Sequence, residues 1–242
     1  MNHLVAFLIL AASISLPLPA AEPPRVHAAR ASHSKRIADL FKAAHIHSPA
    51  GTLLLRAFKQ EGLLELWAGE SRTAPLKLIT TYPICARSGG PGPKERDGDE
   101  QVPEGFYQIA KLNPWSNYHL SLQIDYPNQA DRARAHGVSL RDLGGEIFIH
   151  GNCVTIGCIP IEDGPIEELY LIAQDAHAHG ATISAHLFPA RPGSAAWNAL
   201  QKSAASARRE FWTSLESGYD AFEATHLLPR IESNSAGNYL VH

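Results

Sequence analysis

A histidine and a cysteine, His150 and Cys158, are the two side chains in this sequence best suited to chemistry. A cysteine becomes a good nucleophile when a neighbouring base or a positive environment lowers the pKa of its thiol and holds it within reach. The preceding residue, Gly157, has no Cβ and lets backbone N–H groups turn towards an oxyanion. The segment therefore predicts a cysteine acyl-transfer site, in which His150 acts first as general base and then as general acid to the leaving amine.

Each of these residues also has an ordinary structural interpretation. An unpaired cysteine is often a buried and inert hydrophobe, and a histidine at a strand end is often simply hydrogen-bonded. Gly157 argues against a core cysteine, because a glycine beside it contributes no packing. Zinc is the competing chemistry, with His150, Cys153, Cys158 and the distant His186 as ligands, but cysteines in zinc ribbons come in closer pairs. We therefore expect no metal and no cofactor.

The N-terminal segment indicates where the protein works. Residues 4–18 are apolar or small and two alanines follow soon after, which is typical of a secretory signal peptide rather than of a membrane span. A buried N-terminal helix is the alternative, and Pro17 and Pro19 disfavour it. We expect residues 1–21 to be a signal peptide and the protein to be exported to the periplasm or cell envelope.

Three cysteines, an odd number, leave at least one thiol unpaired within the chain. We assign the free thiol to Cys158, the candidate nucleophile. Whether Cys85 and Cys153 form a disulfide stays open, because spacing does not define pairing. For Cys153, a disulfide, a redox partnership with Cys158 and a core position are all considered, and the core position is the prediction.

Composition and patterning define the class of fold. The chain has 242 residues, 45% of them hydrophobic, and a net charge of -3, which suits one globular domain. A nucleic-acid partner is set aside because no basic cluster appears. Apolar runs and turn signals predict a mainly β fold with flanking helices. Strands are expected over 52–58, 63–68, 76–84, 105–109, 120–126, 146–150 and 181–188, and helices over 34–44, from 163 and over 195–217.

The segments between these elements are expected to be irregular. Residues 22–34 are rich in Pro, Ala and Arg and are interpreted as a linker. Residues 128–144 are polar and are expected to form a loop. The long polar segment 88–101 is expected to be a lid, a groove wall or a plain surface loop, since long loops in compact domains are often functional.

At this point the chain resembles a known family. The string His150-Gly151, then Thr155-Ile156-Gly157-Cys158, resembles the YkuD-type L,D-transpeptidase signature, in its YafK-like subgroup with a short interval between His and Cys. The resemblance covers residues 35–228, which we take as the catalytic domain, with 229–242 as a C-terminal tail. Further blocks that resemble the subgroup are Tyr82-Pro83-Ile84-Cys85, Gly92-Pro93-Lys94, and residues 101–107, 126–128, 166–168, 186–189, 211–212 and 218–220.

The resemblance implies a YkuD-like β-sandwich catalytic domain that acts on peptidoglycan stem peptides. It implies that Cys158 is the nucleophile, His150 its base, Gly151 the residue whose carbonyl orients the imidazole, and that the N–H groups of Gly157 and Cys158 form the oxyanion hole. A thioester would then pass to an amine of a second stem or of a wall-anchored lipoprotein. Water would instead make the protein a carboxypeptidase or an amide hydrolase. A non-catalytic wall-binding module is a third hypothesis.

Two positions depart from the commoner YkuD-type pattern. That pattern has His before Gly-Cys and Arg or Asn two residues after the Cys, where this chain has Ile156 and Pro160. An arginine there would offer a bidentate contact to a substrate carboxylate. The residues that could supply this contact from elsewhere are Arg87, Lys94, Arg96 and Arg191.

Overall fold

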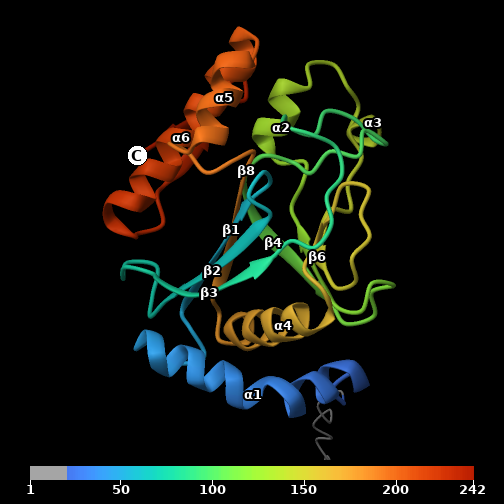
Figure 1. The fold of residues 1–242 in the computed structure, drawn as a ribbon, viewed down its shortest axis with the longest axis vertical. Coiled ribbons are helices and arrows are strands. Elements are labelled where there is room, and N and C mark those ends of the chain that lie inside the picture. The colour runs from blue at the N-terminus through green and yellow to red at the C-terminus, as the bar shows by residue number, and fades with distance from the viewer. Residues whose placement is uncertain (1–20) are drawn as a thin grey trace, which may run out of the picture.

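A computed structural model describes residues 21–242 of the chain (Figure 1). The signal peptide expected over 1–21 lies outside the described residues except for its last position. Within the described part, none of the helices combines the length and the apolar character needed to cross a bilayer.

The body of the described chain is a single eight-stranded sheet. Its strands are β1 (Thr52–Phe58), β2 (Leu63–Gly69), β3 (Lys77–Pro83), β4 (Gly105–Asn113), β5 (Ser121–Ile124), β6 (Phe148–His150), β7 (Ile159–Pro160) and β8 (Thr182–Phe188). They lie in the order β3-β2-β1-β8-β4-β5-β6-β7. The sheet curls until its two edges meet. The contact between them is a hydrogen bond from the N–H of Cys85, just after β3, to the carbonyl of Pro160 in β7 at 3.0 Å. All the expected strands are present, β7 was not expected, and the predicted mainly β fold is confirmed.

Apolar side chains on both faces of β1 explain why it is buried along its whole length. Successive side chains of a strand point to opposite faces. Leu53 and Leu55 therefore pack on one face of the sheet, against α4 (Asp163–Ala178), while Leu54 and Phe58 pack on the other, under α6 (Ser206–Thr225). The sheet thus sits between helical layers, as near-continuous apolar strands require.

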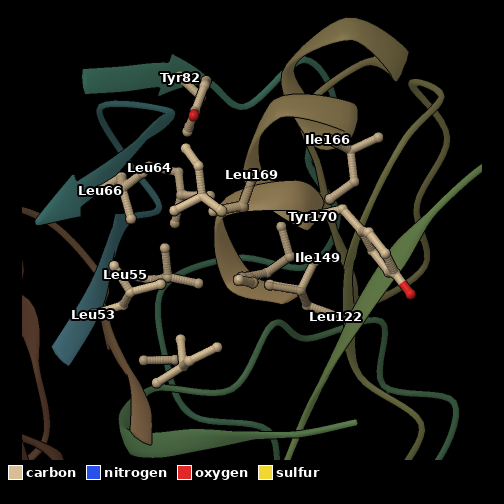
Figure 2. Packing of buried hydrophobic residues seen from close by; sticks show 14 of the residues in the cluster. Leu53, Leu55, Leu64, Leu66, Tyr82, Leu122, Ile149, Ile166, Leu169 and Tyr170 are labelled. Carbon is tan, nitrogen blue, oxygen red and sulfur yellow. The ribbon is translucent and has the colours of Figure 1, made fainter. Parts of the chain in front are cut away.

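The main core lies between the curled sheet and α4. Ile166 and Leu169 of α4 belong to one buried cluster with Leu53, Leu122 and Ile149 of the strands, all of which are labelled in Figure 2. This packing fixes β6, the strand that carries His150, against the helix.

The predicted linker is wrong. Residues 24–34 form the first half of α1 (Pro24–Ala44), which lies along the outside of α4 (Figure 1). Proline is favoured in the first turn of a helix, and the alanine-rich segment has high helix propensity. Val26 is fully buried, and Arg30 forms an ion pair with Asp175 of α4 at 2.9 Å. The composition alone predicts a linker because this burial depends on α4, far away in sequence.

Two other segments are more ordered than expected. Residues 128–144 contain α2 (Gln129–Arg134) and α3 (Leu140–Leu143), whose first turns are capped by Asn128 and Ser139. The stretch expected as one helix over 195–217 forms two, α5 (Ala195–Ser203) and α6.

The C-terminal segment 229–242 packs against the domain rather than trailing from it. It forms a hairpin of β9 (Ile231–Ser233) and β10 (Tyr239–Val241). The Tyr239 ring is buried, and its backbone N–H donates to the hydroxyl of Ser214 in α6 at 3.1 Å.

Candidate active site

The strand pairing brings together the two segments that carry His150 and Cys158. β6 and β7 pair in parallel, with Ile149 opposite Ile159 and His150 opposite Pro160. Ile149 and Ile159 belong to the core packed on α4. Because side chains alternate along a strand, His150 projects from the opposite face, and Cys158 is the residue that immediately precedes β7. The pairing thus brings the segment that begins with Cys158 beside the strand that ends with His150.

The His150 ring is held in one orientation. It is only 2% exposed, and its Nδ1 lies 2.5 Å from the carbonyl oxygen of Gly151. A neutral imidazole that donates from Nδ1 leaves Nε2 free to accept a proton. Burial lowers the pKa of His150, and the Gly151 carbonyl opposes that shift. The Tyr118 ring lies over the imidazole at 4.8 Å. The residue is therefore a neutral, oriented base.

Close packing explains why position 151 is a glycine. A Cβ at Gly151 would lie 2.5 Å from Oδ1 of Asp163 and 3.0 Å from the Cβ of His119. Asp163 begins α4 and accepts a hydrogen bond from the N–H of Asn152 at 2.8 Å. Any side chain at 151 would displace this carboxylate, and with it the carbonyl that orients His150.

The two N–H groups expected to form an oxyanion hole already have a partner. Those of Gly157 and Cys158 donate to Oγ1 of Thr155 at 3.2 and 2.8 Å, and the Thr155 hydroxyl donates to the Cys158 carbonyl at 2.8 Å. A substrate oxyanion would have to take the place of this hydroxyl. This role of Thr155 is not predicted above, although hydroxyl side chains commonly cap nearby N–H groups in this way.

The surroundings of Cys158 favour the neutral thiol. Burial raises its pKa, while hydrogen bonding from the Phe148 backbone and the charge of Lys94 lower it. The thiol donates to the carbonyl of Glu146 at 3.7 Å. No hydrogen bond joins it to the imidazole within residues 21–242. A thiol of this kind needs a base to become a nucleophile.

Cys158 is the free cysteine, as predicted, because Cys85 and Cys153 form a disulfide with a Cα–Cα distance of 5.5 Å. The core position predicted for Cys153 is wrong: the residue is exposed, and its bond ties the loop between β6 and β7 to the segment after β3. A bridged cysteine cannot offer a thiolate to zinc. His186 lies on β8, and the four candidate zinc ligands do not converge in the described chain.

A small cavity of about 60 Å³ opens beside the thiol. It is lined by Cys158, by Lys59 after β1 and by Arg87 after β3. The Lys59 ammonium is already occupied by Glu104 at 2.9 Å and by two carbonyls. Arg87 makes no ion pair with any described residue, and its guanidinium lies against Gly62. It is therefore the cavity's available cation.

The other basic candidates for a substrate carboxylate are placed differently. Lys94 is buried and paired with Asp99 at 2.6 Å. Arg191 is paired with Glu65 at 2.6 Å. Arg96 does not line the cavity beside the thiol. Of the four, Arg87 is the one that shares a cavity with Cys158.

The segment 88–101 forms a wall of this cavity. The Asp99 carboxylate organises it by accepting hydrogen bonds from Lys94 and from the N–H groups of Glu95, Arg96 and Gln101. Residues 88–90 line the cavity. Of the three alternatives for this segment, the groove wall fits the structure.

Comparison with known proteins identifies the family. Residues 64–180 match the family model of the YkuD L,D-transpeptidase catalytic domain. The protein named "Putative L,D-transpeptidase YafK" in Escherichia coli (strain K12) is 35% identical over 192 residues, which cover 77% of this chain and 72% of that protein. The same values hold for YafK of Escherichia coli O157:H7. The chain therefore belongs to the YkuD family of L,D-transpeptidase catalytic domains.

Solved structures show more distant similarity. Pgp2, a helical cell shape determining protein of Campylobacter jejuni, is 16% identical, with 82% of this chain and 80% of that chain covered and a TM-score of 0.47. Bd1075 of Bdellovibrio bacteriovorus is 16% identical, with 78% and 79% covered and a TM-score of 0.41.

Proposed function

We propose that this protein is an exported L,D-transpeptidase, a cysteine acyltransferase that acts on peptidoglycan stem peptides. One observation carries the proposal: His150, oriented by the Gly151 carbonyl and kept neutral by burial, ends β6, and the free thiol of Cys158 directly precedes the paired strand β7. Family membership supports the same chemistry.

In the proposed reaction, Nε2 of His150 takes the proton of the Cys158 thiol as the sulfur attacks a stem amide carbonyl. The N–H groups of Gly157 and Cys158 leave the Thr155 hydroxyl and donate to the tetrahedral oxyanion. The imidazolium then protonates the departing terminal D-amino acid, and a thioester remains. An acceptor amine attacks the thioester, its proton passes through His150, and the thiol is restored with a new amide bond formed.

Arg87 is the proposed contact for a carboxylate of the stem peptide. Arg87 is an exposed residue, has no acidic partner among the described residues and lines the same cavity as Cys158. It would supply the contact that an arginine two residues after the cysteine would make, a position that Pro160 occupies here.

The test is incubation of the purified mature protein with a disaccharide-tetrapeptide, followed by mass spectrometry, beside Cys158→Ala. An adduct on Cys158 followed by a cross-linked dimer supports the transpeptidase. An adduct that resolves only to the tripeptide assigns the protein as a hydrolase, for which water replaces the amine.

Wall-linked lipoprotein is the second donor in this test. Release or transfer of the lipoprotein by the wild-type protein, but not by Cys158→Ala, supports acyl transfer with a different donor. Absence of an adduct with both donors contradicts the proposal and favours the non-catalytic wall-binding module, whose ligand affinity would survive Cys158→Ala.

A further inference from the structure

A second cleft, of about 460 Å³, lies on the α6 side of the sheet and shares no lining residue with the cavity beside the thiol. It opens where β4 leaves β8: the two strands pair from Gly105 to Gln108, and β4 then pairs with β5. β9 of the C-terminal hairpin forms one wall. We call it the outer cleft. A volume of this size is typical of small-ligand sites.

The floor of the outer cleft holds buried polar groups without partners. His186 is 5% exposed and Ser184 is 9% exposed. Both alternate along β8 with residues of the core, so they face the cleft. Neither side chain hydrogen-bonds to any residue of the described chain, and neither is among the polar atoms sealed from solvent. Buried polar groups normally have a partner, so these two are positioned for a ligand or for water.

The His186 imidazole is fixed and neutral. The ring of Phe106 packs edge-on against it at 4.7 Å. Burial lowers the pKa of His186 to about 3, with a further contribution from Arg56. A neutral imidazole offers one donor and one acceptor, which is what a peptide amide group requires.

The two sides of the floor carry opposite charges. Arg72 donates to Oγ1 of Thr182 at 2.9 Å, at the start of β8. Asp125, at the end of β5, accepts from the N–H of Gln108 in β4 at 2.8 Å. Because β8 and β4 are neighbours and β5 lies beyond β4, the guanidinium and the carboxylate stand on opposite sides of the floor. Neither makes an ion pair within residues 21–242.

The cleft is preformed by the C-terminal hairpin. The Tyr239 hydroxyl accepts hydrogen bonds from the N–H of Phe106 and from Nδ2 of Asn128, both at 3.3 Å. The hairpin's own charges, Arg230 and Glu232, pair with each other at 2.7 Å. Arg72 and Asp125 therefore remain the free charges of the site.

We propose that the outer cleft binds a short peptide with free ends. The peptide carboxylate pairs with Arg72, its ammonium with Asp125, and its amide group hydrogen-bonds to His186 and Ser184. This binding site is separate from the thiol and goes beyond the acyl transfer proposed above.

The experiment is calorimetric titration of the mature protein with the dipeptide alanyl-alanine. We expect saturable binding, with the same Kd for the wild-type protein and for Cys158→Ala. Arg72→Gln and Asp125→Asn should each raise Kd by about 10-fold, because each removes one charge-assisted contact. Arg141→Gln, which removes a charge from α3 outside the cleft, should leave Kd unchanged. Thermal melting checks that each variant is folded.

Capped peptides test the orientation without relying on variants. N-acetyl-alanyl-alanine should bind the wild-type protein about 10-fold more weakly, and Asp125→Asn should add no further loss. Alanyl-alanine amide should likewise bind the wild-type protein about 10-fold more weakly than the free dipeptide, and Arg72→Gln should add no further loss.

The proposal is overturned if the capped and free peptides bind equally, if no saturable binding occurs, or if Cys158→Ala abolishes it. Binding of di-N-acetylchitobiose in place of the peptide also overturns it, in favour of a glycan. Since the readout is binding and not turnover, failure here leaves the proposed acyl transfer intact, and failure of acyl transfer leaves this site standing.

Discussion

The thiol site and the outer cleft differ in whether their key polar groups have hydrogen-bond partners within the chain. At the thiol site, the groups proposed for catalysis already have partners in the chain: the Gly151 carbonyl bonds to His150, and the Thr155 hydroxyl accepts from the N–H groups of Gly157 and Cys158. On the floor of the outer cleft, His186 and Ser184 have no partner within residues 21–242. The difference matches the two proposed tasks. Bond making needs groups fixed before substrate arrives, whereas binding needs unfilled hydrogen-bonding capacity.

The largest expected effect comes from removing the oriented base. His150→Gln is expected to slow thioester formation by about 10²- to 10⁴-fold, because a positioned base contributes that much. Rapid-quench mass spectrometry of the Cys158 adduct measures the rate. His179→Gln, at an exposed position after α4, should leave it unchanged. A wild-type rate in His150→Gln would place the base elsewhere.

The pH dependence tests whether the pair rests neutral. Burial lowers the pKa of His150 and raises that of Cys158. As the pH is lowered, kcat/KM should therefore begin to decrease only below about pH 6.5, the ordinary pKa of histidine. Free thiolate should form only above about pH 8.5, the ordinary pKa of cysteine. Between these limits the neutral pair gives a plateau. Rapid alkylation of Cys158 by iodoacetamide at pH 6 would show a thiolate–imidazolium pair instead.

Arg87 should affect substrate binding rather than the chemical step. Arg87→Gln is expected to lower kcat/KM for the tetrapeptide by about 10- to 100-fold, the range for a lost hydrogen bond to a charged group. Most of the loss should appear in KM. On a substrate with amidated carboxylates, the wild-type protein and Arg87→Gln should have the same kcat/KM. The control Arg96→Gln should have the wild-type kcat/KM on the tetrapeptide. An equal loss on the amidated substrate would make Arg87 a structural residue.

The local part of the site could be predicted from the sequence. His150 and Cys158 lie within one short segment, and a parallel pairing offset by ten residues brings the two ends of that segment side by side. The motif that resembles the YkuD signature lies in that same segment. Thr155 was within reach of the same analysis, but its capping depends on the backbone turn that brings two N–H groups to its hydroxyl.

The long-range part could not be predicted. The Cys85–Cys153 disulfide joins residues 68 apart, and spacing alone permits several pairings. The first half of α1 has the composition of a linker and is helical because it packs on α4. The outer cleft gathers residues from β4, β8 and β9, together with Arg72 after β2 and Asp125 after β5, so that no local pattern indicates it.

His186 gives a prediction for the stability of the outer cleft. Because its pKa is about 3 in the folded protein, against about 6.5 when unfolded, the unfolded state binds the proton first. The free energy of unfolding should therefore fall as the pH drops below 6.5, by about 2 kcal/mol at pH 5. Denaturant titrations at several pH values measure this slope. His186→Gln should flatten it relative to His177→Gln, an exposed control, and parallel curves would contradict the assignment.

The smallest expected effect separates resting structure from chemistry at Thr155. Thr155→Val keeps the shape of the side chain and removes the acceptor of two N–H groups, so the free energy of unfolding should fall by about 1–2 kcal/mol. Thr155→Ser keeps the hydroxyl and should therefore keep most of the wild-type stability. Thioester formation should change by less than about 10-fold, since the N–H groups bond the oxyanion and not the hydroxyl in the transition state. Denaturant titration and rapid-quench rates measure the two effects. If the rate falls as far as in His150→Gln, the Thr155 hydroxyl itself contacts the reacting atoms. Thr155 would then take part in the chemistry and would not serve only as the resting partner of two N–H groups, which is the contrast drawn with the outer cleft.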